Sequence, residues 1–156
     1  MPTPDDYFQL QRLLDLYARL IDEDRLEEWV ELFSPEGRYE IISRENLAQG
    51  FALPLMLCEN RNQIADRVMS LRKANIYNIH TDRHIISQLH VERSAEGWCV
   101  GANFALFQTN QEGVSSLYSV GRYDDLVRPV DGRLMFISKR VIVDTGAVPS
   151  LLATPI

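Results

Sequence analysis

Near the start of the chain, apolar residues recur at spacings of three and four, which is the period of one face of a helix. Asp5 and Asp6 follow Pro4 and suit a helix start, because carboxylates accept hydrogen bonds from the free N–H groups of the first turn and complement the helix dipole. The pattern predicts an amphipathic helix over residues 5–21. Its apolar stripe consists of Leu10, Leu13, Leu14, Tyr17 and Ile21.

A second, shorter helix is predicted over residues 24–33, with Asp24 as its N-cap. Ser34-Pro35 should end it, because the residue before a proline disfavours the helical conformation. Residues 37–43 then have the character of a strand. The inward side chains expected from this second helix are Trp29, Leu32 and Phe33.

Residues 44–59 show no clean period and include Gly50 and Pro54, so they are predicted to form a long loop. The loop is unusually apolar, and such side chains commonly pack over a cavity mouth or against a partner subunit. Residues 60–73 follow as a third helix. Its inward face should carry Ile64, Val68 and Leu71.

The second half of the chain alternates with a period of two, which is typical of strands. Short Gly-containing turns separate the alternating runs and favour antiparallel pairing of consecutive strands. The predicted strands cover residues 83–93, 98–109, 114–128 and 133–144.

Apolar side chains occur on both faces of this predicted sheet. Trp98, Val100 and Phe104 share one face, whereas in the last strand Phe136 and Val141 fall on opposite faces. Helices that precede a strongly curved antiparallel sheet indicate an α+β cone, with the helices filling the concave face. The convex face would then be covered by another chain, and a closed homo-oligomer is the usual solution. The apolar tail docks either on its own cone or on a partner; it contains Val148, Leu151, Leu152 and Ile156.

Composition limits the partners that this chain could have. Its 156 residues are 46% apolar and carry 16 basic against 22 acidic side chains, for a net charge of −6. We expect one domain over residues 1–156. An acidic surface disfavours nucleic acid and anionic membranes, and no apolar run approaches the roughly 20 residues needed to span a bilayer. The predicted location is cytoplasmic, where Cys58 and Cys99 would stay reduced.

His80, Asp82 and His84 form a local cluster that could offer two imidazoles and a carboxylate to a non-haem iron. In an extended segment these alternate residues would share one face. The competing interpretation, which we favour, is a cluster of ion pairs and hydrogen bonds at the start of a strand. We therefore assign no metal ligand in this chain.

Asp22 and His84 form a second candidate site. A carboxylate at a helix end and an imidazole at a strand start could exchange protons in an apolar pocket, with Tyr17 or Tyr39 as a polar aid. The structural interpretation, a helix-end residue and a satisfied core or interface histidine, is favoured for both. Charged residues farther along are expected to be exposed strand charges or an intersubunit patch; these are Arg122, Asp124, Asp125 and Arg128.

Several segments, taken in order, resemble the small (β) subunit of Rieske-type aromatic-ring-hydroxylating dioxygenases. Two further segments are similar to small subunits that act with substituted benzoates, of the salicylate hydroxylase, anthranilate dioxygenase and terephthalate dioxygenase types. One departure is Asp82, where many relatives carry a small or hydroxylic residue. The general resemblance rests on Tyr17, Asp22, Trp29, Leu32-Phe33, Tyr39, Asp66-Arg67-Val68, Arg83-His84-Ile85-Ile86-Ser87, Gly121-Arg122-Tyr123, Asp125, Lys139-Arg140-Val141 and Asp144; the benzoate-type likeness rests on Arg44-Glu45-Asn46, Gly50 and residues 66–77.

This resemblance implies the cystatin-like cone shared by nuclear transport factor 2, SnoaL-like proteins and ketosteroid isomerase. It implies an α3β3 assembly in which three β chains form a homotrimer beside the catalytic large (α) subunits. The large subunit would carry the Rieske 2Fe-2S cluster and the mononuclear non-haem iron, and a reductase, with or without a ferredoxin, would supply electrons. The small subunit would hold no cofactor and support the reaction on a substituted benzoate-type acid.

The alternative is a free-standing dehydratase or isomerase on the same fold, with Asp22 and His84 as its acid–base pair, because one fold hosts many functions. Under the subunit interpretation, the convex face should form much of the trimer or large-subunit contact. Its expected contributors are Tyr118, Arg122, Lys139 and Arg140.

Overall fold

The computed structural model describes residues 1–50, 53–74, 79–144 and 154–156. Within them, a six-stranded sheet runs in the order β2-β1-β6-β5-β4-β3. β1 pairs with β6 in parallel, and the other four pairings are antiparallel. The helices are α1 (Pro4–Asp22), α2 (Leu26–Val30), α3 (Arg44–Ala48) and α4 (Arg61–Ala74), and the strands are β1 (Phe33–Ser43), β2 (Met56–Cys58), β3 (His80–Arg93), β4 (Trp98–Asn110), β5 (Ser115–Val130) and β6 (Arg133–Val143).

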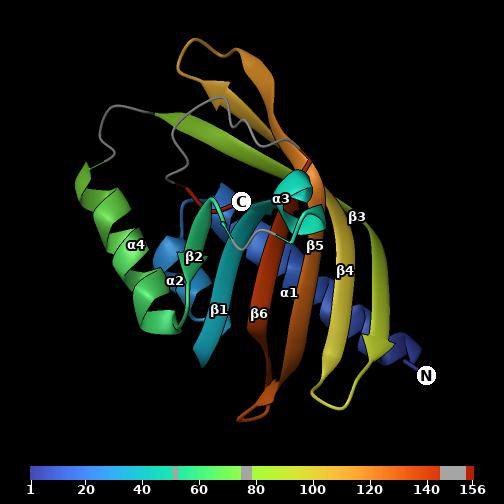
Figure 1. The fold of residues 1–156 in the computed structure, drawn as a ribbon. Coiled ribbons are helices and arrows are strands. Elements are labelled where there is room, and N and C mark those ends of the chain that lie inside the picture. The colour runs from blue at the N-terminus through green and yellow to red at the C-terminus, as the bar shows by residue number, and fades with distance from the viewer. Residues whose placement is uncertain (51–52, 75–78, 145–153) are drawn as a thin grey trace.

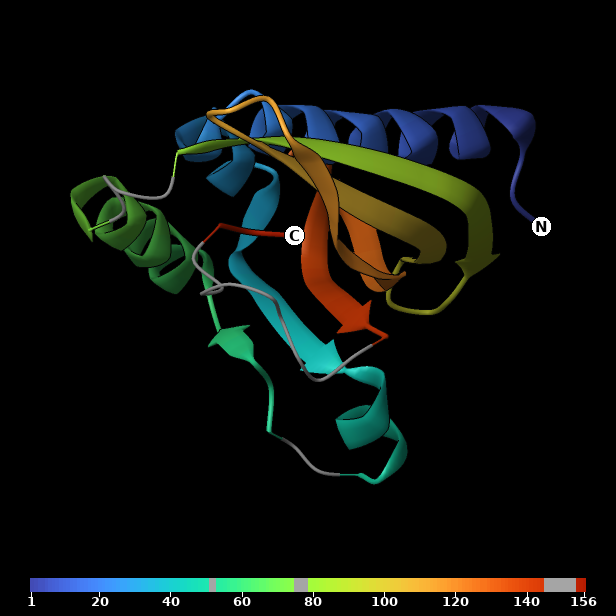
Figure 2. The same ribbon diagram turned by 90° about the horizontal axis from the view of Figure 1, so that it is seen from above.

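The sheet curls around a core that α1 and α2 cover from one side (Figures 1 and 2). The predicted stripe of α1 is buried throughout, and Thr3 starts the helix with a capping box. Its hydroxyl accepts a hydrogen bond from the Asp6 N–H, while the Asp6 carboxylate accepts one from the Thr3 N–H. The α+β cone is therefore confirmed, and so are the four long strands to within a few residues at their ends.

The prediction for residues 24–33 was wrong at both ends. Asp24 has a φ of +57° and lies outside the helix, and Arg25 is the N-cap. Phe33 starts β1, so Ser34 and Pro35 lie inside a strand rather than ending a helix. The β1–β6 register shifts between Phe33 and Arg38, and an irregularity of this kind accommodates a proline that cannot donate to the ladder.

In place of the predicted loop over residues 44–59, the described residues 44–50 and 53–59 contain a short helix and a short strand. Ser43 caps α3 by accepting a hydrogen bond from the Asn46 N–H. Farther on, β2 adds an edge strand to β1, with Cys58 opposite Tyr39. Both elements are too short for a repeating pattern of apolar residues to reveal them. Phe51, one of the apolar residues of the predicted loop, lies outside the described residues.

Aromatic rings form the centre of the core on the concave side. Tyr17 packs edge-on against Phe136 and Tyr123, with ring centroids 5.6 and 5.8 Å apart. Trp29 packs in the same way against Tyr39 at 5.3 Å. The predicted inward face of β4 is buried, and its members are Trp98, Val100, Ala102, Phe104 and Leu106.

Candidate functional site

Asp22 and His84 lie together as the sequence predicted, although 62 residues separate them. One carboxylate oxygen of Asp22, at the last position of α1, is 2.6 Å from His84 Nδ1 on β3. The other accepts a hydrogen bond from the His84 main-chain N–H at 2.9 Å. Asp22 thus fastens the end of α1 to β3 through both the backbone and the ring.

The surroundings of this pair favour a structural role. The His84 side chain has no exposed surface, and its Nε2 is buried without a hydrogen-bond partner. Tyr17 and Tyr39 do not assist the pair, since their hydroxyls donate to the main-chain oxygen of Ile156. A general acid or base must reach its substrate within hydrogen-bond distance. His84 Nε2 is buried, and both Asp22 carboxylate oxygens are already hydrogen-bonded to His84.

His80, Asp82 and His84 share one face of β3, as alternation requires. His80 Nε2 is 3.3 Å from Asp82 Oδ1, whereas Nδ1 of His84 pairs with Asp22 Oδ1. Burial raises the pKa of the Asp82 carboxyl above its usual range, against the opposing effect of His80. No group of three His, Cys, Asp or Glu side chains in the described part of the chain is placed to hold a metal ion.

Sequence reasoning missed a buried ion pair between neighbouring strands. Lys139 Nζ lies 2.8 Å from Asp125 Oδ2, and both side chains are fully buried. The Lys139 ammonium also lies 3.4 Å from the ring centre of Tyr123 and 4.2 Å from that of Tyr17. Burial raises the pKa of Asp125 to about 6 and lowers the pKa of Lys139 to about 8.

Two predictions about charged residues are therefore wrong. Asp125 is not an exposed strand charge, and Lys139 does not belong to the convex face. Alternation could have found both, because Asp125 is two residues from buried Tyr123 and Lys139 two residues from buried Val141. Tyr118, which we also expected on the convex face, is buried.

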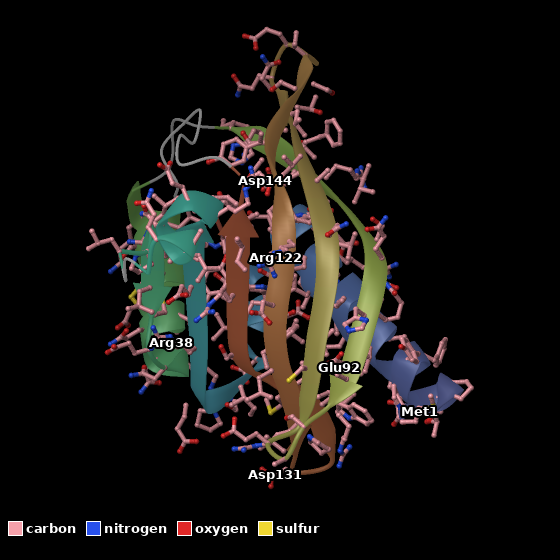
Figure 3. The ribbon with its side chains drawn as sticks, turned by 45° about the vertical axis from the view of Figure 1, so that its right-hand side comes forward. Met1, Arg38, Glu92, Arg122, Asp131 and Asp144 are labelled. Carbon is pink, nitrogen blue, oxygen red and sulfur yellow. The ribbon has the colours of Figure 1, made fainter. Side chains whose placement is uncertain are left out.

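The convex face carries a chain of charged side chains across three strands. Glu40 on β1 accepts hydrogen bonds from Arg38 at 3.1 Å and from Arg140 of β6 at 2.9 Å. A guanidinium nitrogen of Arg140 also lies 4.0 Å from a carboxylate oxygen of Asp124 on β5. Arg122 is exposed beside this chain, and Figure 3 shows it with Arg38 on the side of the sheet away from α1.

Exposed apolar side chains accompany these charges. Ile85 on β3 is 56% exposed and Leu117 on β5 is 52% exposed. Each is paired across the ladder with an outward residue of β4, Ala105 and Phe107 respectively. This mixture of charged and apolar groups is typical of a surface that contacts another protein.

The structure describes only part of the apolar C-terminal tail. Of the tail residues, Ile156 is fully buried in its own cone, whereas Val148, Leu151 and Leu152 lie outside the described residues.

None of the helices that the structure describes has the length and apolar character needed to cross a lipid bilayer. Cys58 is buried and Cys99 is exposed, and both are free thiols.

Comparison with known families gives a match over most of the chain. The family model described as "Ring hydroxylating beta subunit" matches residues 17–150. The anthranilate 1,2-dioxygenase small subunit of Burkholderia cepacia is 41% identical over 152 residues, which cover 96% of this chain and 94% of the relative. The terephthalate 1,2-dioxygenase terminal oxygenase component subunit beta 1 of Comamonas sp is 26% identical over 141 residues, or 90% and 92% of the two chains.

Solved structures agree with these matches. A β subunit from Novosphingobium aromaticivorans, provisionally assigned to an aromatic-ring-hydroxylating dioxygenase, superposes with a TM-score of 0.86 at 33% identity and covers 95% of each chain. The benzoate 1,2-dioxygenase β subunit of Burkholderia mallei gives 0.74 at 19% identity, covering 92% and 93%. A provisionally assigned scytalone dehydratase gives 0.73 at 15% identity, covering 96% and 91%, which shows a shared fold alone.

Proposed function

The chain belongs to the ring-hydroxylating β-subunit family of aromatic dioxygenases, and from this we propose that it is a non-catalytic small subunit that supports a catalytic large subunit. The observation that carries the proposal is the 41% identity to a dioxygenase small subunit over nearly the whole of both chains. A match of this length includes the cone, the convex face and the loops between them.

The cofactors of such an oxygenase do not fit the residues of this chain. A Rieske cluster takes two Cys and two His, and a facial-triad iron takes two His and a carboxylate. The chain has three His in total, and each lies beside a different carboxylate: His84 beside Asp22, His80 beside Asp82, and His90 beside Glu92. The Rieske 2Fe-2S cluster and the mononuclear iron would belong to the large subunit.

The assembly would place the convex face against other subunits. We expect a homotrimer of small subunits within an α3β3 complex, served by a reductase with or without a ferredoxin. The face offers the Arg38–Glu40–Arg140 charges beside apolar Ile85 and Leu117. Charges at an interface rim select partners, while apolar side chains supply buried area.

The substrate we propose is an aromatic acid of the substituted benzoate type. The similar small subunits come from oxygenases named for anthranilate and terephthalate, both of which are benzoates with a further substituent. Because the reacting groups would lie in the large subunit, the identity of the ring substituent is a property of the complex.

Co-expression with an anthranilate-type large subunit tests the proposal directly. We expect the two chains to co-purify and the complex, given its reductase, to consume oxygen with a panel of substituted benzoates. Arg122→Glu on the convex face should lower the yield of complex by about tenfold, because a charge reversal at an interface opposes docking. Arg12→Glu, on the exposed side of α1, is the matched control and should assemble normally. Failure to co-purify with any large subunit would contradict the proposal.

The alternative, a free-standing dehydratase or isomerase, rests on the 2.6 Å contact between Asp22 and His84 and on the unpartnered His84 Nε2. The two functions differ in what Asp22→Asn and His84→Ala should do. In a supporting subunit these variants lower assembly more than they lower turnover per assembled complex. If the chain alone converted a cyclic ketone or a phenol, and the variants abolished this without affecting assembly, the isomerase-like function would be favoured.

A further inference from the structure

Three leucines are exposed in the segment that leads into and forms the edge strand β2. Leu53 is 70% exposed, Leu55 42% and Leu57 38%. Burial alternates along this segment, since Met56 and Cys58 are buried while the three leucines are not. A run of exposed apolar side chains marks a surface that contacts another protein. We call these three residues the leucine lobe.

Two acidic side chains flank the leucine lobe. Glu59 follows β2 directly and is exposed. Glu45 lies on α3, which is held beside the lobe because Asn46 donates a hydrogen bond to the main-chain oxygen of Leu53 at 3.2 Å. Within the described ranges, neither carboxylate has a basic side chain at ion-pair distance. The lobe is therefore an apolar surface with negative charge at its edges.

A groove of complementary character lies between α1 and the start of β6. It has a volume of about 650 Å³. Its apolar lining includes Leu16, which is 42% exposed, and the half-buried Leu32 and Leu134. Arg19 and Arg133 border it, and neither has a carboxylate at ion-pair distance in the part of the chain that the structure describes. We call this the α1–β6 groove.

The carboxylates that line the α1–β6 groove have partners of their own. Asp15 accepts a hydrogen bond from Gln11 at 2.8 Å. Glu31 has a carboxylate oxygen 3.8 Å from a guanidinium nitrogen of Arg61. The two bordering arginines thus keep their positive charge open to a partner, on a chain whose net charge is −6. Such a groove selects an acidic and apolar occupant, which is the character of the leucine lobe.

The two surfaces match in length and lie on opposite sides of the molecule. Α1 covers the concave side of the sheet, whereas α3 and the segment that leads into β2 lie away from it (Figures 1 and 2). The lobe spans about 13 Å if the chain is extended, and the groove residues on α1, from Gln9 to Arg19, span about 15 Å. Two copies cannot join both pairs of opposite surfaces at once. A contact between them is therefore head-to-tail, the kind that can close into a ring.

We propose that the leucine lobe of one copy docks in the α1–β6 groove of the next copy, and that three such contacts close the homotrimer. The leucines cover the apolar lining of the groove, and the carboxylates at the edges of the lobe pair with the two bordering arginines. The number of copies rests on the proposed function, whereas the contact itself needs no large subunit.

Sedimentation velocity of the small subunit alone, at micromolar concentration, tests this contact. The wild type should sediment as a trimer. Leu55→Asp in the lobe and Arg133→Glu in the groove should each weaken association by about a hundredfold or more and leave monomers, because each places a charge against an apolar surface or a like charge. Arg12→Glu is the matched control and should remain a trimer. Arg12 borders the same groove but stacks on Phe8, with its guanidinium carbon 5.7 Å from the ring centre.

Mixing the two monomeric variants separates a head-to-tail contact from a symmetric one. The Leu55→Asp variant keeps its groove and the Arg133→Glu variant keeps its lobe, so one intact contact should join them into a dimer with one copy of each. This dimer needs a higher concentration, because a single contact lacks the avidity of a closed ring.

The proposal is overturned if the wild type alone is a monomer, if either variant stays a trimer, or if the mixture contains only monomers. Co-purification with a large subunit in any of these cases would leave the proposed function standing. A trimer that joins in this way but binds no large subunit would contradict the proposed function and support the contact.

Discussion

Replacing Lys139 with methionine should destabilise the protein far more than replacing both members of its ion pair. At 2.8 Å, two unit charges in an effective dielectric of 20 attract each other by about 6 kcal/mol. Removing each charge from water costs several kcal/mol, so the intact pair is close to neutral for stability. Lys139→Met leaves the Asp125 carboxylate buried without its partner. We expect this single variant to lower the free energy of unfolding by about 3–5 kcal/mol.

The double variant Asp125→Val/Lys139→Met comes close to the same volume without charge, so its stability should equal or exceed that of the wild type, by up to about 4 kcal/mol. Urea unfolding at pH 7, followed by circular dichroism, measures all three proteins. A cost of less than about 1 kcal/mol for Lys139→Met, or a loss in the double variant as large as that in the single variant, would contradict an unpaired buried carboxylate as the cause.

The pH dependence gives the same pair an independent check. Because folding raises the pKa of Asp125 to about 6, the folded state binds more protons than the unfolded state between pH 3.8 and 6, and the pair's contribution to stability falls as pH rises there. Because folding lowers the pKa of Lys139 to about 8, the unfolded state binds more protons between pH 8 and 10.5, and the contribution rises again. The advantage of the double variant should therefore be greatest between pH 6 and 8. An advantage that did not change with pH would contradict the assigned shifts.

Three further outcomes are expected. Asp22→Asn should lower the free energy of unfolding by about 1–3 kcal/mol, because the His84 ring and N–H lose a charged acceptor; urea unfolding measures this, and an unchanged midpoint would count against the fastening role. Thr3→Ala removes the cap of α1 and should cost about 1 kcal/mol in the same assay, without changing the yield of complex with the large subunit. Glu40→Gln weakens the acceptor shared by Arg38 and Arg140 and should lower that yield by a similar factor at low and high salt, because Glu40 is buried and salt screens buried charges weakly; a yield equal to that of the wild type would count against a role of these charges in assembly.

Local patterns predicted the parts of this fold that long regular elements dictate. The stripe of α1 and the inward face of β4 each repeat often enough to define a face. Asp22 and His84 could be paired because the pattern placed one at the end of a helix and the other near the start of a strand, although β3 in fact begins four residues earlier, at His80. The prediction failed where elements are only a few residues long, as in α3 and β2, and where Ser34-Pro35 lies at a shift in strand register.

The failure at Lys139 has a different origin. Alternation places Lys139 on the inner face, but a lysine is rarely buried unless it is paired. Its partner Asp125 lies on the neighbouring strand, and the rings around its ammonium come from Tyr17 on α1 and Tyr123 on β5. These partners are distant from Lys139 in the sequence. The usual exposure of lysine therefore led to the wrong prediction, although the alternation of the strand placed Lys139 inside.

The parallel pairing of β1 with β6 determines when the sheet can form during synthesis of the chain. Tyr39 and Lys139 are opposite each other in this pairing, although they are about 100 residues apart in the chain. Pairings of such long range form slowly, and during synthesis β1 must wait with an unpaired edge until β6 has left the ribosome. An unpaired edge is a site for misassociation. The Arg38–Glu40–Arg140 charges span this same joint, so the surface offered to a partner subunit exists only once the chain has been made almost to its end.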